Sequence, residues 1–181
     1  MKACVFCSAS EGLPSAILRE AEIFCDELKA RGGELLYGGH RNGLMGYFAD
    51  AALKRGTKVR GAITKHLNET FEVGHKGLHE LVIVKDLFER KRWFIDESDV
   101  FFVFPGGFGT LDEALEVITW KGLGELDKPI VFVNIDGFWD STLDSYRDLE
   151  RRKVVRSGAM AIFEVVANSR DAFKCLEKGS I

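Results

Sequence analysis

Residues 100–113 read VFFVFPGGFGTLDE, an apolar run followed by a glycine-rich turn, a threonine and two acids. The apolar residues at 100–104 do not alternate with polar ones, which is typical of a strand buried on both faces of a parallel sheet. The glycines that follow permit backbone conformations that other residues avoid. Helical spacing of apolar residues then runs from Thr110 to about Lys121, so we expect a strand, a tight turn and a helix.

The same order of strand, turn and helix recurs along the chain. We expect strands at residues 2–9, 34–39, 58–63, 80–85, 100–104, 129–135 and 162–167. We expect helices at residues 14–30, 44–54, 86–98, 110–121, 138–152 and 169–178, and a loop or short helix within 64–79. This alternation predicts an α/β fold, an open doubly wound and mostly parallel sheet of about seven strands with helices on both faces. The 181 residues suffice for a single domain, 1–181.

The composition excludes several classes of protein. A chain with 46% hydrophobic and 29% charged residues is typical of a folded globular protein rather than a disordered one. Its net charge of −3 gives no electrostatic reason to expect a nucleic-acid or membrane partner. No apolar run approaches the ~18–20 residues of a membrane span. The first residues read as a strand rather than a signal peptide, so we expect a cytoplasmic protein.

Cysteine and histidine pairs offer weak signals for redox or metal chemistry. Cys4 and Cys7 form a C-x-x-C pair, but on a strand this spacing puts them on opposite faces, which favours reduced structural thiols. His75 and His79 lie four residues apart, a spacing that can ligate a metal on a helix. No third ligand is evident for them in the sequence, so solvent-exposed or loop histidines are favoured over a metal site.

Two glycine-rich turns are candidates for an anion site. YGGHRNGLMG at residues 37–46 and PGGFGT at residues 105–110 each join an expected strand to an expected helix. Glycines let a ligand approach the backbone, and a helix start offers unpaired N–H groups. Neither turn matches the dinucleotide fingerprint or a P-loop. A tight packing turn is the plain alternative for either one, but two such turns on one sheet favour a nucleotide phosphate.

The acids after the second turn allow two interpretations. Thr110 and Glu113 have capping-box spacing, with Thr110 as N-cap and Glu113 reaching back to its backbone. Alternatively, Glu113 belongs to a face with Glu116 and Trp120 that suits a sugar and a base. The opposite, apolar face would consist of Leu111, Ala114, Leu115 and Ile118. Both interpretations remain open, as does a merely solvated face.

Two cations disturb the expected helix at residues 86–98. Lys91 falls in the middle of its apolar stripe, and Arg90 lies at the edge of that stripe. The stripe itself consists of Leu87, Phe88, Phe94 and Ile95. A buried cation is costly without a partner, so the two side chains either extend out to water or point into a ligand cleft beside the glycine-rich turn.

These motifs together resemble a known family. The string P-G-G-x-G-T-x-x-E from Pro105 to Glu113, with Arg90-Lys91 before it and YGGHRNGLMG further upstream, is similar to the Lonely guy (LOG) phosphoribohydrolases, which activate cytokinins and are often labelled "possible lysine decarboxylase". The resemblance implies a Rossmann-like fold and hydrolysis of the N-glycosidic bond of a nucleoside 5′-monophosphate, either AMP or a cytokinin riboside monophosphate. The products would be a free base and ribose 5-phosphate. It further implies that no metal or other cofactor is needed, and that the protein is a homodimer with the site close to the subunit interface.

The resemblance also implies roles for individual residues. Glu113 would be the catalytic carboxylate and Arg90 its catalytic partner. The phosphate would be held by Gly106, Gly107, Gly109 and Thr110. The rest of the nucleotide site would be lined by Lys91, Glu116 and Thr119, and by Ser8, Gly39, Gly43 and Met45 from the other turns. A non-catalytic nucleotide or cofactor binder, such as a molybdenum-cofactor carrier, is the alternative function. No lysine stands out as a pyridoxal site, so lysine decarboxylation is not expected.

The sequence departs from the family pattern at the first turn and before Arg90. Plant-like members of the family usually have a glycine where this chain has His40, which is followed by Arg41 and Asn42. Leu87 and Phe88 replace a methionine and a histidine. These departures leave Arg90, Lys91 and Glu113 in place, but they leave the preferred base open.

Overall fold

In the computed structural model, which describes residues 1–71 and 73–177, one parallel sheet runs through the molecule. Its strands are β1 (Lys2–Phe6), β2 (Glu34–Tyr37), β3 (Lys58–Thr64), β4 (Glu80–Val84), β5 (Val100–Val103), β6 (Ile130–Val133) and β7 (Glu164–Val166). In this part of the chain the strand order is β4-β3-β2-β1-β5-β6-β7, and each of these pairings is parallel. The predicted doubly wound sheet is confirmed.

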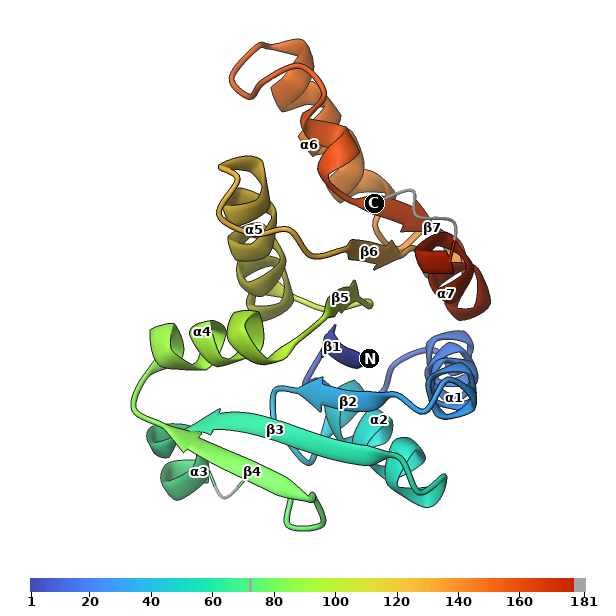
Figure 1. Cartoon of the computed structure of the whole chain (residues 1–181), viewed down its shortest axis with the longest axis vertical. Helices are drawn as coiled ribbons and strands as arrows, with labels where there is room; N and C mark the ends of the chain where they lie inside the picture. Colours follow the sequence, from blue (N-terminus) through green and yellow to red (C-terminus); the bar gives the residue numbers. More distant parts are fainter. Residues whose placement is uncertain (72, 178–181) are drawn as a thin grey trace.

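Helices cover both faces of the sheet (Figure 1). They are α1 (Ser15–Ala30), α2 (Gly43–Lys54), α3 (Lys65–Phe71), α4 (Leu87–Glu97), α5 (Phe108–Gly122), α6 (Asp140–Arg151) and α7 (Ser169–Glu177). Helices α1, α2 and α7 share a core on one face, and α4, α5 and α6 pack on the other. None of these helices, within the described residues, is long and apolar enough to cross a membrane.

Aromatic side chains fill the core beneath α1 and α2. The ring of Phe24 lies 4.9 Å from that of Phe102, 5.3 Å from Phe104 and 5.5 Å from Phe48, centroid to centroid. All four side chains are fully buried. Strand β5 contributes side chains to this core and to the core on the opposite face. Its apolar run is unbroken because both of its faces are buried, as the sequence suggested.

The C-x-x-C pair divides between the two cores. Cys4 packs in the core under α4 and α5, whereas Cys7 packs in the core under α1 and α2. Both thiols are free and buried, and burial raises the pKa of each well above its ordinary value. The expectation of structural thiols on opposite faces is confirmed.

The strand order brings three turns together at the carboxyl edge of the sheet. The chain builds outward from β1 to β4, returns through α4, and resumes at β5 on the other side of β1. In the turn after β1, the Ser8 N–H donates to the Pro105 carbonyl at 3.1 Å, and the Ser8 carbonyl accepts from the Met45 N–H at 3.1 Å. Ser8 thus joins the two glycine-rich turns. This reversal of strand order is where doubly wound sheets bind their ligands.

Helix α5 begins earlier than the sequence pattern suggested. Its N-cap is Gly107, and the Leu111 N–H donates to the Gly107 carbonyl at 3.0 Å. Thr110 therefore lies within the first turn of the helix, and the interpretation of Thr110 as N-cap of a capping box is wrong. The apolar periodicity could not locate this start, because Phe108 is 93% exposed and Gly109 has no side chain, so neither belongs to a buried apolar face.

Other boundaries differ by a few residues. The segment 64–79 contains the short helix α3, in agreement with the expected loop or short helix. The last expected helix, 169–178, is observed as α7 up to Glu177, and Lys178 lies outside the described residues.

Candidate active site

One face of α5 carries the candidate catalytic carboxylate inward. Glu113 is only 5% exposed, and the neighbouring Thr110, Ala114 and Val117 are buried with it. The buried face of α5 is therefore rotated from the apolar face that the sequence predicted, in which Leu115, observed to be 44% exposed, was included. Glu113 therefore does not lie on a solvated face, and its burial requires a charged or hydrogen-bonding partner.

Arg90 of α4 is that partner. Its Nη1 donates to Glu113 Oε1 at 3.0 Å, its Nη2 to the Gly38 carbonyl at 3.0 Å, and its Nε to the Ala62 carbonyl at 2.8 Å. The side chain is 11% exposed. The guanidinium thus joins α4 to the ends of β2 and β3 and to α5. Of the two interpretations of this cation, the structure supports a paired position beside the glycine-rich turns rather than extension to water.

Space for the Arg90 guanidinium depends on a glycine. A Cβ at Gly38 would lie 2.2 Å from Arg90 Nη2 and 2.9 Å from Met45 Sδ. Gly38 and Ala62 were not identified from the sequence as site residues. They act through backbone carbonyls, which carry no residue-type signal, although the Gly-Gly pair in the first turn pointed to Gly38.

Lys91 has acidic partners of its own. Its Nζ donates to Glu116 Oε2 at 2.9 Å and to Asp112 Oδ1 at 3.2 Å, and its side chain is 12% exposed. Burial lowers the pKa of Lys91, but the hydrogen bonds that Lys91 donates to Glu116 and Asp112 outweigh burial, so the pKa lies above its ordinary value. The structure therefore brings Lys91 and Glu116 together with Glu113, one turn apart on the same side of α5.

Burial also sets the protonation of Glu113. It raises the pKa of the Glu113 carboxyl above its ordinary value, and the positive charge of Arg90 offsets only part of that rise. No described residue donates to the second oxygen, Oε2. This oxygen is thus available to a ligand or a water molecule.

The turn after β5 leads into α5, and this turn and the start of the helix together contain three glycines, so few side chains occupy the space around the start of this helix. Thr110 is buried, and its Oγ1 lies 2.1 Å from where a Gly106 Cβ would be. A Cβ at Gly107 or Gly109 would meet nothing within 4 Å. No side chain caps this helix, so the N–H groups of its first turn can donate hydrogen bonds to an anion.

The turn after β2 needs its glycines for backbone reasons. Gly39 and Gly43 have φ of +73° and +63°, and a Cβ at Gly43 would lie 2.3 Å from the Ala9 backbone. Met45 is buried and lies beside Gly38. Among the predicted site residues, Gly39, Gly43 and Met45 thus belong to the turn after β2 and the start of α2, and Ser8 connects this turn to the turn after β5.

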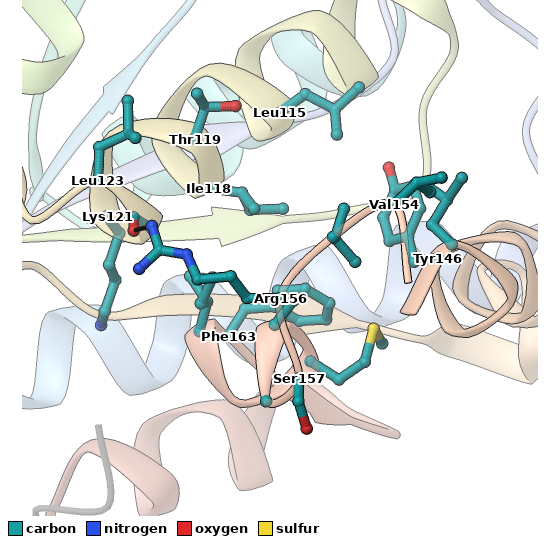
Figure 2. Close-up of a pocket in the computed structure, with 17 residues that line it drawn as sticks. Leu115, Ile118, Thr119, Lys121, Leu123, Tyr146, Val154, Arg156, Ser157 and Phe163 are labelled. Atoms are coloured by element: carbon teal, nitrogen blue, oxygen red, sulfur yellow. Dashed lines mark hydrogen bonds between the residues drawn. The ribbon is translucent and has the colours of Figure 1, made fainter. Parts of the chain in front are cut away.

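Thr119 is the predicted site residue that lies apart. It lines an apolar groove of about 570 Å³ on the outer side of α5, together with Leu115, Ile118 and Leu123 (Figure 2). The far wall includes Tyr146, Val154 and Phe163. Because this groove lies on the opposite side of α5 from Glu113, the structure does not bring Thr119 to the Arg90–Glu113 pair.

The histidine pair has other partners. His75 Nε2 lies 3.0 Å from Asp50 Oδ1, and His79 Nδ1 accepts from the Val59 N–H at 3.1 Å. Over residues 1–71 and 73–177, no group of three His, Cys, Asp or Glu residues could hold a metal ion.

Known proteins resemble this chain in sequence. Residues 45–176 match the family described as "Possible lysine decarboxylase". A rice protein (Oryza sativa subsp. japonica) named "Probable cytokinin riboside 5′-monophosphate phosphoribohydrolase LOGL1" is 43% identical over 140 residues, which cover 77% of this chain and 62% of the relative. The Arabidopsis thaliana protein "Cytokinin riboside 5′-monophosphate phosphoribohydrolase LOG4" is 36% identical over 177 residues, 98% of this chain and 82% of the relative.

A solved structure resembles the fold. The molybdenum cofactor binding protein of Rippkaea orientalis superimposes with a TM-score of 0.74 and 16% identity, covering 98% of this chain and 95% of that one. At this identity the likeness shows a shared fold and nothing of the ligand.

The raised pKa of Glu113 predicts how its replacement alters stability with pH. A carboxyl with a raised folded-state pKa stabilises the protein below its unfolded value of about 4.5, and this contribution is lost as pH rises through the folded pKa. Gln does not titrate. The unfolding free energy of Glu113→Gln minus that of the unaltered protein should therefore increase as the pH rises above about 4.5.

Urea denaturation at several pH values measures this difference. Glu69→Gln, on the outside of α3, is the matched control for loss of a carboxylate. A difference for Glu113→Gln that stays constant or falls with pH would show that Arg90, rather than burial, governs the carboxyl.

Proposed function

This chain belongs to the LOG family of cytokinin riboside 5′-monophosphate phosphoribohydrolases, and we propose that it hydrolyses the N-glycosidic bond of a nucleoside 5′-monophosphate to a free base and ribose 5-phosphate. AMP and cytokinin riboside monophosphates are the candidate substrates. Because the chain spans 62% of the length of LOGL1 and 82% of that of LOG4, the activity is carried over as a proposal for the residues present here.

The buried pair of Arg90 and Glu113 carries this proposal. The carboxylate lies one helical turn beyond the open N-terminus of α5, with its Oε1 held by Arg90 at 3.0 Å. A phosphate at the helix start and a carboxylate one turn on suit the two ends of a ribose 5-phosphate group. A nucleotide bound this way would place its anomeric carbon near Glu113.

Glu113 would act on the ribose. Cleavage of a glycosidic bond passes through an oxocarbenium-like state, whose positive charge a carboxylate stabilises. The raised pKa of Glu113 also suits a general base that takes a proton from the attacking water. In this scheme the water oxygen bonds to the anomeric carbon, its proton moves to Glu113, and the electron pair of the broken bond leaves with the base.

Arg90 would orient the carboxylate. Its bonds to the Gly38 and Ala62 carbonyls fix the guanidinium independently of Glu113. The carboxylate is therefore held in one orientation while Oε2 remains available, an arrangement that lowers the cost of reaching the transition state.

We propose Gly106, Gly107, Gly109 and Thr110 as the phosphate site, and Lys91 and Glu116 as lining the nucleotide beside it. The open space at Gly107 and Gly109 and the uncapped helix support the phosphate assignment. Ser8, Gly39, Gly43 and Met45 would lie toward the base. Thr119 is assigned no contact, because it faces the groove on the far side of α5.

The proposed activity is tested with AMP and a cytokinin riboside monophosphate, with release of free base followed by chromatography. Glu113→Gln should lower kcat by roughly 10²–10⁴-fold, because it keeps a hydrogen-bond acceptor for Arg90 but removes the charge and the base. The Glu69→Gln variant should retain activity. A Glu113→Gln protein that turns over at the full rate would make this carboxylate structural only.

The phosphate assignment is tested with Gly107→Ala. A methyl group there meets no protein atom within 4 Å, so folding stability should change little. It would occupy the space needed by a phosphate, and we expect KM for AMP to rise by about tenfold or more, equivalent to at least ~1.4 kcal/mol of binding. Gly122→Ala, at the other end of α5, is the control; an unchanged KM for Gly107→Ala would place the phosphate elsewhere.

We also propose that the protein is a homodimer whose interface borders the site. Leu87, Phe88 and Phe108 are 54%, 79% and 93% exposed, and they lie at the starts of α4 and α5 beside the acids and cations of the site. Exposed apolar side chains at the starts of two helices that ion pairs join support an interface.

Sedimentation equilibrium tests this interface. We expect twice the chain mass for the unaltered protein and the single chain mass for Phe88→Glu, because a charge at a buried apolar interface is costly. Phe71→Glu, an exposed phenylalanine on α3, should leave the dimer intact. A monomeric unaltered protein would refute the proposal.

A cofactor carrier remains the alternative from another class. It has support only from the shared fold with the molybdenum-cofactor binding protein at 16% identity. The family membership and the paired Arg90 and Glu113 favour the hydrolase.

A further inference from the structure

His40 occupies a rigid position in the turn between β2 and α2. Its backbone forms an antiparallel bridge with Gly74. On either side, the Arg41 N–H donates to the Val73 carbonyl at 2.8 Å, and the His75 N–H donates to the Gly39 carbonyl at 2.9 Å. Backbone hydrogen bonds therefore hold the turn against residues 73–75 as in a pair of strands. They fix the position of the His40 backbone, from which the imidazole extends.

The hydrogen bonding of the ring fixes its tautomer. His40 Nδ1 accepts from the Asn42 N–H at 3.2 Å, so in the neutral ring the proton is on Nε2. No described residue accepts a hydrogen bond from Nε2. The side chain is half-buried, and its Nε2–H is a hydrogen-bond donor that a ligand can use.

The surroundings keep the ring neutral. Burial lowers the pKa of His40, and the positive charges of Arg90 and Arg41 lower it further. At neutral pH the side chain is thus a hydrogen-bond donor without a charge, and it offers no attraction to the phosphate of the substrate.

The place of His40 relative to the catalytic pair suggests which part of the substrate it meets. The phosphate turn follows β5, whereas His40 follows β2, and β1 lies between these strands. Arg90 spans this distance, since it bonds both Glu113 and the Gly38 carbonyl two residues before His40. In a nucleotide the phosphate and the base extend from opposite sides of the ribose. With the phosphate on α5 and the ribose at Glu113, the base lies over the β2 turn.

We propose that His40 donates a hydrogen bond from Nε2–H to N3 or N7 of the leaving purine, and so sets the base preference of the site. This inference rests on the proposed hydrolase function. As the glycosidic bond breaks, its electron pair moves onto the base and makes the ring nitrogens better acceptors. A fixed donor therefore binds the transition state more strongly than the ground state. No proton leaves His40, and the released base takes its proton from solvent.

A cycle of substrate and protein changes tests the hydrogen bond. The substrates are AMP, 7-deaza-AMP and 3-deaza-AMP, each analogue lacking one ring acceptor, and the variants are His40→Gly and His40→Gln. We expect His40→Gly to lower kcat/KM for AMP by about tenfold. One of the analogues should show no such dependence on His40, because its acceptor is already missing. His40→Gln, which restores an N–H donor, should recover part of the loss, and His66→Ala should match the unaltered protein.

Two results would overturn the inference. Equal losses on His40→Gly for AMP and for both analogues would mean that His40 contacts neither N3 nor N7, and an unchanged kcat/KM for AMP would mean that it contacts no part of the substrate. If the unaltered protein releases no base from AMP or from a cytokinin riboside monophosphate, the proposed function fails instead. The Kd values of the same variants and analogues, measured by calorimetry, then test the His40 contact separately. If the effects of His40→Gly and of one deaza substitution on Kd are not additive, the contact is supported; if they are additive for both analogues, it is refuted.

Discussion

The buried guanidinium of Arg90 is the interaction on which the site depends. This one side chain donates hydrogen bonds to the carbonyls of Gly38 and Ala62, and its positive charge pairs with the carboxylate of Glu113. A buried carboxylate without such a partner would be strongly destabilising or would be protonated. The ends of β2 and β3 are thereby locked to α5, and the two glycine-rich turns are held in fixed register across β1.

The same constraint explains the glycines around the site. Gly38 must lack a side chain because the guanidinium fills that space, and Gly43 must lack one because the backbone of Ala9 does. At Gly107 and Gly109 the protein leaves the space empty. The first kind of glycine serves the packing of the site, whereas the second kind is the one that a phosphate would use. The pattern of glycines alone does not distinguish them.

The cations of α4 divide between two tasks. Arg90 is bound mainly by backbone and by one buried carboxylate, so its position does not depend on a ligand. Lys91 is bound by Asp112 and Glu116, which are 58% and 29% exposed, so its partners remain in contact with water. A rigid arginine beside a lysine with exchangeable partners is an arrangement that can bind an anionic substrate without rebuilding the carboxylate site.

By itself the sequence determined the fold class, because continuous apolar strands alternating with amphipathic helices have few packing solutions other than a parallel sheet covered on both faces. It also indicated Arg90, Lys91 and Glu113 as candidate site residues, since a cation in an apolar stripe and an acid after a glycine-rich turn can be recognised from the sequence alone. Only the tertiary structure decided that Gly107, rather than Thr110, is the N-cap of α5. It also decided that Glu113 faces Arg90 and that Thr119 faces away from them. Those facts depend on helix phase and on backbone carbonyls of distant strands, and neither leaves a residue-type signal in the sequence.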